Sequence, residues 1–146
     1  MNELDTMRDI LSTCRTIAVV GLSPKPHRAS FDMARYMQSK GWRIIPINPN
    51  ATEILGEPAY PSLTDAARHG PIDLVNVFRN SEDVPPVVTE AIAIGAKAIW
   101  LQLGIEHDQA AKEAQTAGLK LIQDKCLKVE QARLGTTPSA CATIAP

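Results

Sequence analysis

The chain has 146 residues, of which 45% are hydrophobic, and its formal net charge is −1. This length suits one domain with its own core, and the balanced charge gives no general electrostatic reason to bind nucleic acid. No apolar run approaches the ~18 residues of a membrane span, and the polar N-terminus lacks a signal-peptide core. Three cysteines without paired or metal-binding spacing predict reduced thiols in a cytoplasmic protein and no metal site: Cys14, Cys126 and Cys141.

The N-terminal part of the chain begins with a helical pattern. Apolar residues recur at helical spacing over residues 3–13, which predicts a short helix packed against a sheet. The apolar, β-branched run at 16–21 predicts a buried strand. A helical pattern over 30–40 follows, with Ser30 as the expected N-cap.

The rest of the chain alternates between strand and helix patterns. The run at 43–48 predicts a second strand, in which Pro46 removes a backbone donor and should cause a local irregularity. A short strand near 59–60 and a helix opened by a capping box, Ser62-x-x-Asp65, come next. The remaining predicted strands are at 73–78, 97–102 and 120–124. One predicted helix begins within 81–86 and ends before Gly95, and two more are at 106–117 and 126–134.

This alternation is typical of the α/β class. It predicts a doubly wound, mainly parallel, Rossmann-like sheet with helices on both faces. We find no internal repeat, so residues 1–135 are predicted to form a single domain. Residues 136–146 have little to bury and are predicted to form a mobile tail. In such a sheet the ligand binds at the carboxyl ends of the strands, where the strand order reverses.

The segment 17–30, IAVVGLSPKPHRAS, has the features of a phosphate-binding loop. A strand turns at Gly21 and the loop leads into a helix N-terminus, where free N–H groups and the helix dipole favour an anion. The loop keeps the first glycine of a dinucleotide-binding fingerprint but places Ser23 at the second. Lys25 and Arg28 add positive charge, so the pattern predicts a ligand with several phosphates. The alternative is an ordinary turn with solvated basic residues.

Further binding residues are expected where the predicted strands end. These ends bring to one crevice Gly21, Leu22, Ser23, Asn48, Pro49, Phe78, Arg79, Gln102, Leu103, Gly104, Asp124, Lys125 and Cys126. Asn48 stands where a dinucleotide site usually has a carboxylate for the ribose hydroxyls, which disfavours NAD. A neutral side chain near Lys25 and Arg28 instead suits a ribose that carries its own phosphate, as in coenzyme A (CoA).

Several of these residues have structural alternatives. Arg79 either forms an ion pair at the sheet edge or contacts the ligand. Gln102 either binds the ligand or hydrogen-bonds the loop that follows it. Cys126, beside Lys125 and near a helix N-terminus, is the candidate for reactivity, although free cysteines are most often small buried hydrophobes. Asp124 either orients a group in the crevice or caps the last helix, and the cap is the favoured alternative.

Six segments together resemble the family of small stand-alone CoA-binding proteins, which is related to the N-terminal domain of the succinyl-CoA synthetase α subunit. They cover nearly all of residues 12–135: TIAVVGLSPKPHRAS (16–30), IPINPN (45–50), LGEPAYPSL (55–63), VFR (77–79), GAKAIWLQLGI (95–105) and DKCLKVEQARL (124–134). The resemblance implies a Rossmann-like fold with CoA or an acyl-CoA as its ligand. The synthetase reaction is not expected to carry over, because the chain ends before a phosphorylated-histidine domain.

The resemblance also implies three groups of site residues. They are Gly21, Leu22, Ser23, Lys25, Arg28 and Ser30 at the phosphates, Asn48, Pro49, Phe78 and Arg79 at the nucleotide, and Gln102, Gly104 and Cys126 facing the crevice. These residues are the predicted site.

Two functions are consistent with the sequence. The first is a protein that binds CoA or an acyl-CoA without catalysing a reaction. The alternative is a small NAD(P)- or CoA-dependent enzyme that uses Cys126. No nucleophile, base and orienting group can be assembled from neighbouring residues, which favours the first. CoA is the expected partner, with no nucleic acid and no membrane, while homo-oligomerisation, the acyl group and the pathway stay open.

Overall fold

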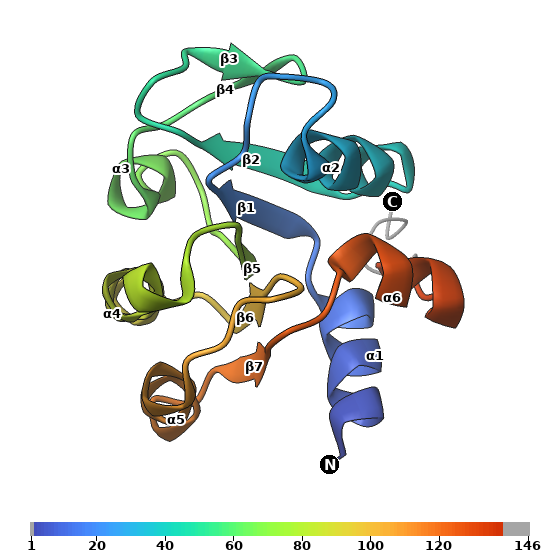
Figure 1. The fold of residues 1–146 in the computed structure, drawn as a ribbon, viewed down its shortest axis with the longest axis vertical. Helices are drawn as coiled ribbons and strands as arrows, with labels where there is room; N and C mark the ends of the chain where they lie inside the picture. The colour runs from blue at the N-terminus through green and yellow to red at the C-terminus, as the bar shows by residue number, and fades with distance from the viewer. Residues whose placement is uncertain (1, 139–146) are drawn as a thin grey trace.

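The computed structural model describes residues 2–138, in which strands and helices alternate along the chain (Figure 1). The strands are β1 (Thr16–Val20), β2 (Arg43–Ile47), β3 (Glu53–Ile54), β4 (Glu57–Pro58), β5 (Leu74–Val77), β6 (Ala98–Leu101) and β7 (Lys120–Ile122). The helices are α1 (Glu3–Thr13), α2 (Ala29–Ser39), α3 (Leu63–Ala67), α4 (Val84–Ala93), α5 (Asp108–Thr116) and α6 (Leu127–Leu134), with a 3₁₀ turn, η1, at Ser81–Asp83.

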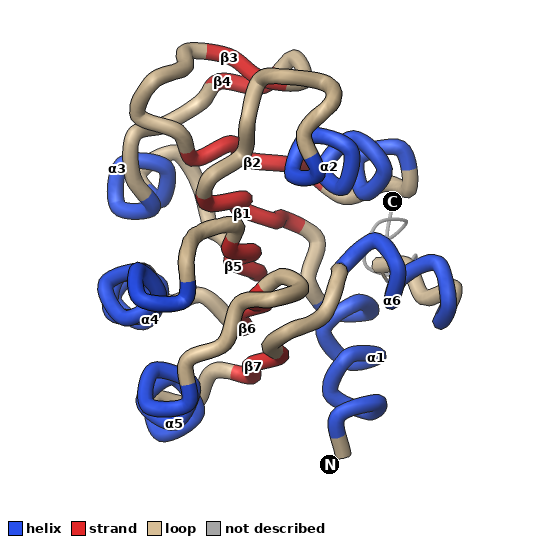
Figure 2. Tube along the Cα trace, in the orientation of Figure 1, coloured by secondary structure: helices blue, strands red, loops and turns tan. Residues whose placement is uncertain are grey.

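Five parallel strands form the central sheet, in the order β2-β1-β5-β6-β7. Helices α3, α4 and α5 cover one face, while α1, α2 and α6 cover the other (Figures 1 and 2). The doubly wound α/β fold with a mainly parallel sheet is thereby confirmed. Strands β3 and β4 form a separate antiparallel hairpin beyond the edge of this sheet.

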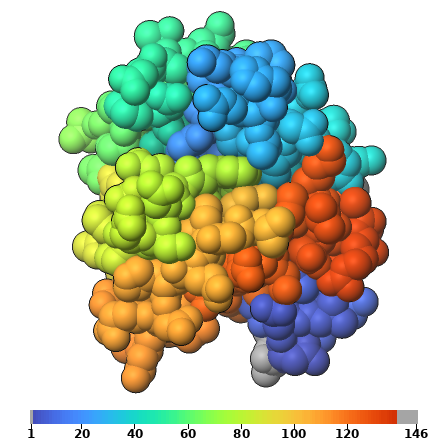
Figure 3. Space-filling model, viewed as in Figure 1, coloured from blue at the N-terminus to red at the C-terminus, as the bar shows by residue number. Residues whose placement is uncertain are grey.

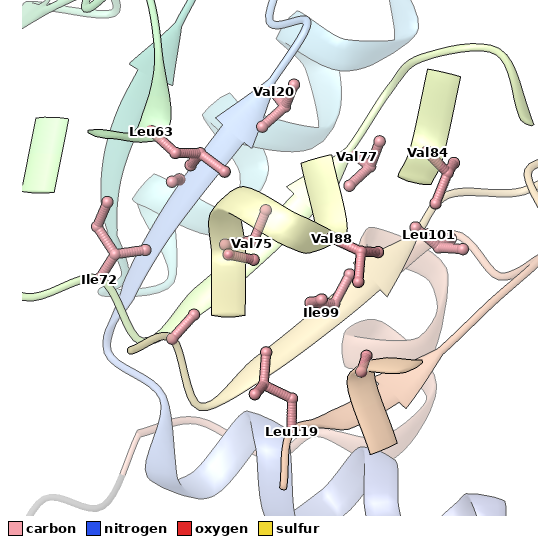
Figure 4. Packing of buried hydrophobic residues seen from close by; sticks show 14 of the residues in the cluster. Val20, Leu63, Ile72, Val75, Val77, Val84, Val88, Ile99, Leu101 and Leu119 are labelled. Carbon is pink, nitrogen blue, oxygen red and sulfur yellow. The ribbon is translucent and has the colours of Figure 1, made fainter. Parts of the chain in front are cut away.

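Each face of the sheet has its own hydrophobic core, because successive strand residues point to opposite faces. Figure 4 shows one core, where Val75 and Ile99 of the sheet lie near Val88 of α4. The other core contains Ile17 of β1 and the fully buried Trp100 of β6. Burial on both faces explains why the central strands read as continuous apolar runs.

The strand order reverses between β1 and β5. From β1 the chain crosses by α2 to β2 on one side, and it then returns to β5 on the other side of β1. The loops that follow β1 and β5 therefore diverge and leave a crevice at the carboxyl edge of the sheet.

Pro46 causes no irregularity, so that expectation is wrong. The parallel pairing of β2 with β1 continues without a break from Arg43 to Ile47. β2 is an edge strand, and the carbonyl of Pro46 faces away from β1 and accepts from the N–H of Tyr60 at 3.0 Å. The missing N–H therefore lies on the side where β1 needs no donor. The strand predicted near 59–60 is a single bridge between Ile47 and Tyr60.

Part of the predicted C-terminal tail cannot be compared with the structure. Residues 139–146, with Cys141 among them, lie outside the described residues. No helix within residues 2–138 combines the length and apolar character needed to cross a bilayer. The same part of the chain holds no group of three or more His, Cys, Asp or Glu side chains that could hold a metal ion.

Cys14, which follows α1, is buried against the N-terminal edge of the sheet. Burial, followed by the nearby Asp73 carboxylate, raises the pKa of the Cys14 thiol from 9.0 to about 11. The unfolded chain therefore ionises this thiol at a lower pH than the folded protein does. The resulting stabilisation is fully present below pH 9.0 and is lost as the pH rises through about 11.

We expect Cys14→Ala to remove this pH dependence. Urea unfolding at pH 8.5 and pH 10.5 should show that the wild type loses up to about 2 kcal/mol more stability than Cys14→Ala, because one pKa unit corresponds to about 1.4 kcal/mol. Cys126→Ala is the control and should retain the wild-type loss. Equal losses in the wild type and in Cys14→Ala would contradict the assignment.

Candidate functional site

The turn after β1 requires glycine at position 21. Gly21 has a φ of +89°, and a Cβ at this residue would lie 2.4 Å from the carbonyl oxygen of Phe78. The N–H of Gly21 donates to the carbonyl of Ile47 at 3.1 Å, and the N–H of Phe78 donates to the carbonyl of Val20 at 2.8 Å. The turn is therefore fixed between the ends of β2 and β5, with no room for a side chain.

Two serines shape the loop between β1 and α2. Ser30 Oγ accepts from the N–H of Ser23 at 3.0 Å, and Ser23 Oγ accepts from the N–H of Lys25 at 3.1 Å. Ser30 is buried at the second position of α2, and Arg28 occupies the N-cap. The prediction of Ser30 as the N-cap is therefore wrong, because its hydroxyl accepts from the loop and not from the helix backbone.

The N-terminus of α2 is open toward this loop. Arg28 makes no side-chain cap bond, so no side chain caps the first N–H groups of the helix. Lys25 and Arg28 are exposed, and neither has an ion-pair partner within residues 2–138. Asp32 is already paired, since hydrogen bonding by Lys128 and then Arg35 holds the pKa of its carboxyl below the usual value. The loop thus presents free N–H groups and two cations to an anion.

Leu22 and Asn48 brace the loop from beneath. Leu22 is fully buried in the core, so it offers only its backbone to a ligand. Its carbonyl accepts from Asn48 Nδ2 at 2.9 Å, while Asn48 Oδ1 accepts from the N–H of Asn50 at 2.7 Å. Asn48 thus has a structural role in addition to the predicted contact with the nucleotide.

Two cavities open at the carboxyl edge of the sheet. The larger cavity has a volume of about 980 Å³ and is lined by Ala29, Phe78, Arg79, Asn80, Ser81, Glu82, Gln102, Leu103, Gly104, Ile105 and Cys126. The start of α2, the loops after β5 and β6, and the start of α6 supply these residues. In Figure 3 these segments meet near the middle of the visible face, between the blue, yellow-green, orange and red parts of the chain.

The smaller cavity lies on the other side of the segment that follows β5. Its volume is about 500 Å³, and it is lined by Val20, Gly21, Ile47, Asn48, Pro49, Asn50, Pro61, Ser62, Leu63, Phe78, Arg79, Val87 and Glu90. Phe78 and Arg79 line both cavities. They therefore mark the boundary between two compartments at the point where the strand order reverses.

The structure divides the predicted site residues into two sets. Those that line a cavity are Gly21, Asn48, Pro49, Phe78, Arg79, Gln102, Gly104 and Cys126. Those that belong to the loop or its support and line neither cavity are Leu22, Ser23, Lys25, Arg28 and Ser30.

Several wall residues escaped the sequence analysis. They are Ala29, Ser81, Glu82 and Ile105 in the larger cavity, and Pro61, Ser62, Val87 and Glu90 in the smaller one. Extending the strand-end rule by a few residues would have found Ser81, Glu82 and Ile105. Val87 and Glu90 lie within α4, and only the packing of that helix brings them to the cavity.

Arg79 is held loosely at the boundary between the cavities. Its guanidinium lies 3.7 Å from the Asp83 carboxylate, and its side chain is 49% exposed. An exposed pair of this kind contributes little to stability. The ion-pair alternative for Arg79 is therefore present in the structure, and because the pair is weak, contact with an anionic group of a ligand stays a prediction.

Asp124 fixes the loop after β6. It has a φ of +58°, its Oδ1 accepts from the N–H of Gly104 at 2.7 Å, and its own N–H donates to the carbonyl of Ile105 at 3.1 Å. The prediction that Asp124 caps α6 is wrong, because the N-cap is Cys126. The left-handed backbone turns the carboxylate toward Gly104 instead, and leaves the half-buried Cys126 at the cavity wall.

A doubly wound, mainly parallel sheet with cavities where its strand order reverses is a Rossmann-like α/β fold. Residues 15–132 match the model of the CoA binding domain family, and the chain belongs to that family. The resemblance seen in the six sequence segments is thereby confirmed.

Relatives of similar length and of greater length share this domain. The uncharacterized protein YneT of Bacillus subtilis is 41% identical over 126 residues, which cover 86% of this chain and 92% of YneT. An ADP-forming acetate–CoA ligase of Archaeoglobus fulgidus is 27% identical over 123 residues, covering 77% of this chain and 18% of the ligase. The solved structure of a hypothetical protein from Pyrococcus horikoshii has a TM-score of 0.86 at 34% identity, with 91% of this chain and 92% of that chain covered.

Proposed function

We propose that the protein binds CoA or an acyl-CoA and holds its phosphates on the loop between β1 and α2. One observation carries this proposal: the Gly21 turn leads into a helix N-terminus without a side-chain cap, beside a large cavity and beside Lys25 and Arg28, which have no ion-pair partner within residues 2–138. Backbone N–H groups, the helix dipole and the two cations all favour phosphate oxygens. Membership of the CoA binding domain family supports the same ligand.

The two cavities suit the two halves of such a ligand. In this proposal the nucleotide lies by the smaller cavity near Asn48, and the pantetheine arm enters the larger cavity. Apolar side chains of Leu103 and Ile105 line the larger cavity, and they match an arm built of methylene groups and neutral amides. The phosphates would then lie between the cavities, under the loop.

The proposal assigns no reaction to the protein. No histidine lines either cavity in the part of the chain that the structure describes, so Cys126 has no imidazole base beside it there. The archaeal ligase is a much longer protein, of which this chain matches 18%. Binding is therefore better supported than the alternative of an enzyme that uses Cys126.

Isothermal titration calorimetry of the full chain with CoA, NAD and NADP tests the proposal. We expect CoA to bind at least about tenfold more tightly than NAD, because the loop supplies two cations for additional phosphate charge. NADP, which carries an extra phosphate on its ribose, separates a general preference for charge from recognition of CoA. Tighter binding of NAD than of CoA would refute the proposed function.

A further inference from the structure

Gln102 is one of the residues that line the larger cavity, although it is only 6% exposed. Its Oε1 accepts from Asn76 Nδ2 and from the N–H of Leu127, each at 3.4 Å. An amide oxygen accepts and an amide nitrogen donates, so two donors around one atom identify that atom as the oxygen. The oxygen of Gln102 therefore faces the interior of the protein.

Asn76 maintains this orientation from the centre of the sheet. It is fully buried on β5, and its Nδ2 also donates to the carbonyl of Trp100 at 3.2 Å. A reversed Asn76 amide would place its oxygen against that carbonyl, so the donor has to face Gln102. Asn76 Oδ1 is buried without a partner among residues 2–138. A buried amide with an unpaired oxygen costs stability, which points to a role other than packing.

The remaining polar atom of the Gln102 side chain is Nε2. Nε2 has no hydrogen-bond partner within residues 2–138, where both contacts of the side chain involve Oε1. Within residues 2–138, Asn76 Oδ1 is the one buried side-chain nitrogen or oxygen atom that lacks a hydrogen-bond partner. Because Nε2 of Gln102 also lacks a partner there, it is not a buried atom. Since the residue lines the larger cavity, its free N–H group is presented there as a donor of fixed direction.

We infer that Gln102 determines specificity by donating from Nε2 to a carbonyl oxygen in the acyl-pantetheine arm of the ligand. This inference rests on the proposed function, because it takes the arm to enter the larger cavity. Two groups of the ligand offer such a neutral acceptor: an amide carbonyl of the arm and the thioester carbonyl of an acyl-CoA.

The surroundings of Gln102 favour a carbonyl over a phosphate. The next residue, Leu103, is 68% exposed on the wall of the same cavity, and it offers apolar contact to an arm. The charged wall residues Arg79 and Glu82 have opposite signs, so the wall carries no net excess of positive charge. Lys25 and Arg28, the cations that suit phosphate and that lack an ion-pair partner in the described part of the chain, belong to the loop after β1 and do not line this cavity.

Two substitutions test the donor Nε2 of Gln102 separately from the acceptor Oε1. Gln102→Glu keeps an oxygen for Asn76 and Leu127 but replaces the donor with an acceptor, and Gln102→Met removes both functions. Gln109→Met on the exposed surface of α5 is the matched control. Calorimetry of the full chain would use CoA, acetyl-CoA and adenosine 3′,5′-bisphosphate, which has phosphates but no arm. Unfolding midpoints show whether each variant is folded.

Both Gln102 variants should bind CoA and acetyl-CoA about three- to tenfold more weakly than the wild type, as expected for loss of one neutral hydrogen bond. Binding of the bisphosphate should stay within about twofold. A larger loss for acetyl-CoA than for CoA assigns the thioester carbonyl, and equal losses assign an amide carbonyl of the arm.

Two results would overturn the inference while leaving the proposed function intact. One is unchanged binding of CoA and acetyl-CoA in a folded variant. The other is an equal loss of bisphosphate binding, which would show that the donor serves a phosphate. A wild-type protein that binds neither CoA nor the bisphosphate would instead refute the proposed function itself.

Discussion

Replacement of Gly21 by alanine is expected to destabilise the protein by about 3 kcal/mol or more, through a strained backbone and an overpacked contact. The new Cβ would lie 2.4 Å from the carbonyl oxygen of Phe78, at a residue whose φ is +89°. Relief requires the loop after β1 to move away from the loop after β5. CoA binding should then fall by at least about a hundredfold, because the N–H groups that we propose to bind phosphate would no longer converge. Urea unfolding and calorimetry measure the two effects.

Gly118 provides a matched control for this substitution. It has a φ of +92°, similar to that of Gly21, but a Cβ there would meet nothing within 4 Å. It lies between α5 and β7, and it lines neither cavity. Gly118→Ala should therefore cost only the backbone term of about 1–2 kcal/mol and leave CoA binding unchanged. If the two variants lost equal stability, the steric argument for Gly21 would be wrong.

The 3′-phosphate of CoA is expected to strengthen binding by roughly ten- to a hundredfold over dephospho-CoA. Charge-assisted contacts contribute about 1.5–3 kcal/mol each, and ~1.4 kcal/mol is a factor of ten. Arg28→Ala should remove most of this difference in affinity, because Arg28 is the expected contact of the 3′-phosphate. The Arg28 side chain is exposed, and no ion-pair partner in the described chain competes with the ligand for it. Calorimetry with both ligands on both proteins gives the four affinities needed.

Arg68→Ala is the control for a general loss of positive charge. Arg68 is exposed at the C-terminal end of α3 and lines neither cavity. This variant should keep the wild-type preference for CoA. Raising the salt concentration should narrow the difference between the ligands in the wild type, since exposed charges are screened. Equal affinity of the wild type for CoA and dephospho-CoA would contradict the role given to Arg28.

Local patterns in the sequence predicted most of the fold. The apolar runs at β1, β5 and β6 were recognisable because both faces of these strands are buried. Ser62 is the N-cap of α3, as its place in the capping-box pattern predicted, and its Oγ accepts from the N–H of Asp65 at 3.1 Å. The Asp65 carboxylate accepts from the Ser62 hydroxyl at 2.9 Å. Such features depend on residues a few positions apart, so the sequence contains all the information that they require.

The errors concern residues whose partners lie far away in the chain or across a turn. Ser30 looks like an N-cap, but its hydroxyl bonds to Ser23. Asp124 precedes a helix, yet its carboxylate accepts from Gly104, which lies 20 residues earlier. In the sequence Pro46 is expected to interrupt its strand, but β2 is an edge strand, so β1 does not need the missing N–H. In each case a tertiary contact decides between local options of similar free energy.

By itself, the sequence determined the α/β class and the strand–loop–helix unit around Gly21, because periodicity and turn chemistry are local properties of the chain. The family was indicated by the resemblance of six sequence segments to known CoA-binding proteins. Only the tertiary structure decided that Phe78 and Arg79 line two cavities and that Asn76 and Leu127 hold the side-chain oxygen of Gln102. Those arrangements depend on strand order and on side-chain hydrogen bonds between distant residues. A local sequence pattern does not show which polar atoms find hydrogen-bond partners in the folded protein and which stay free to bind a ligand.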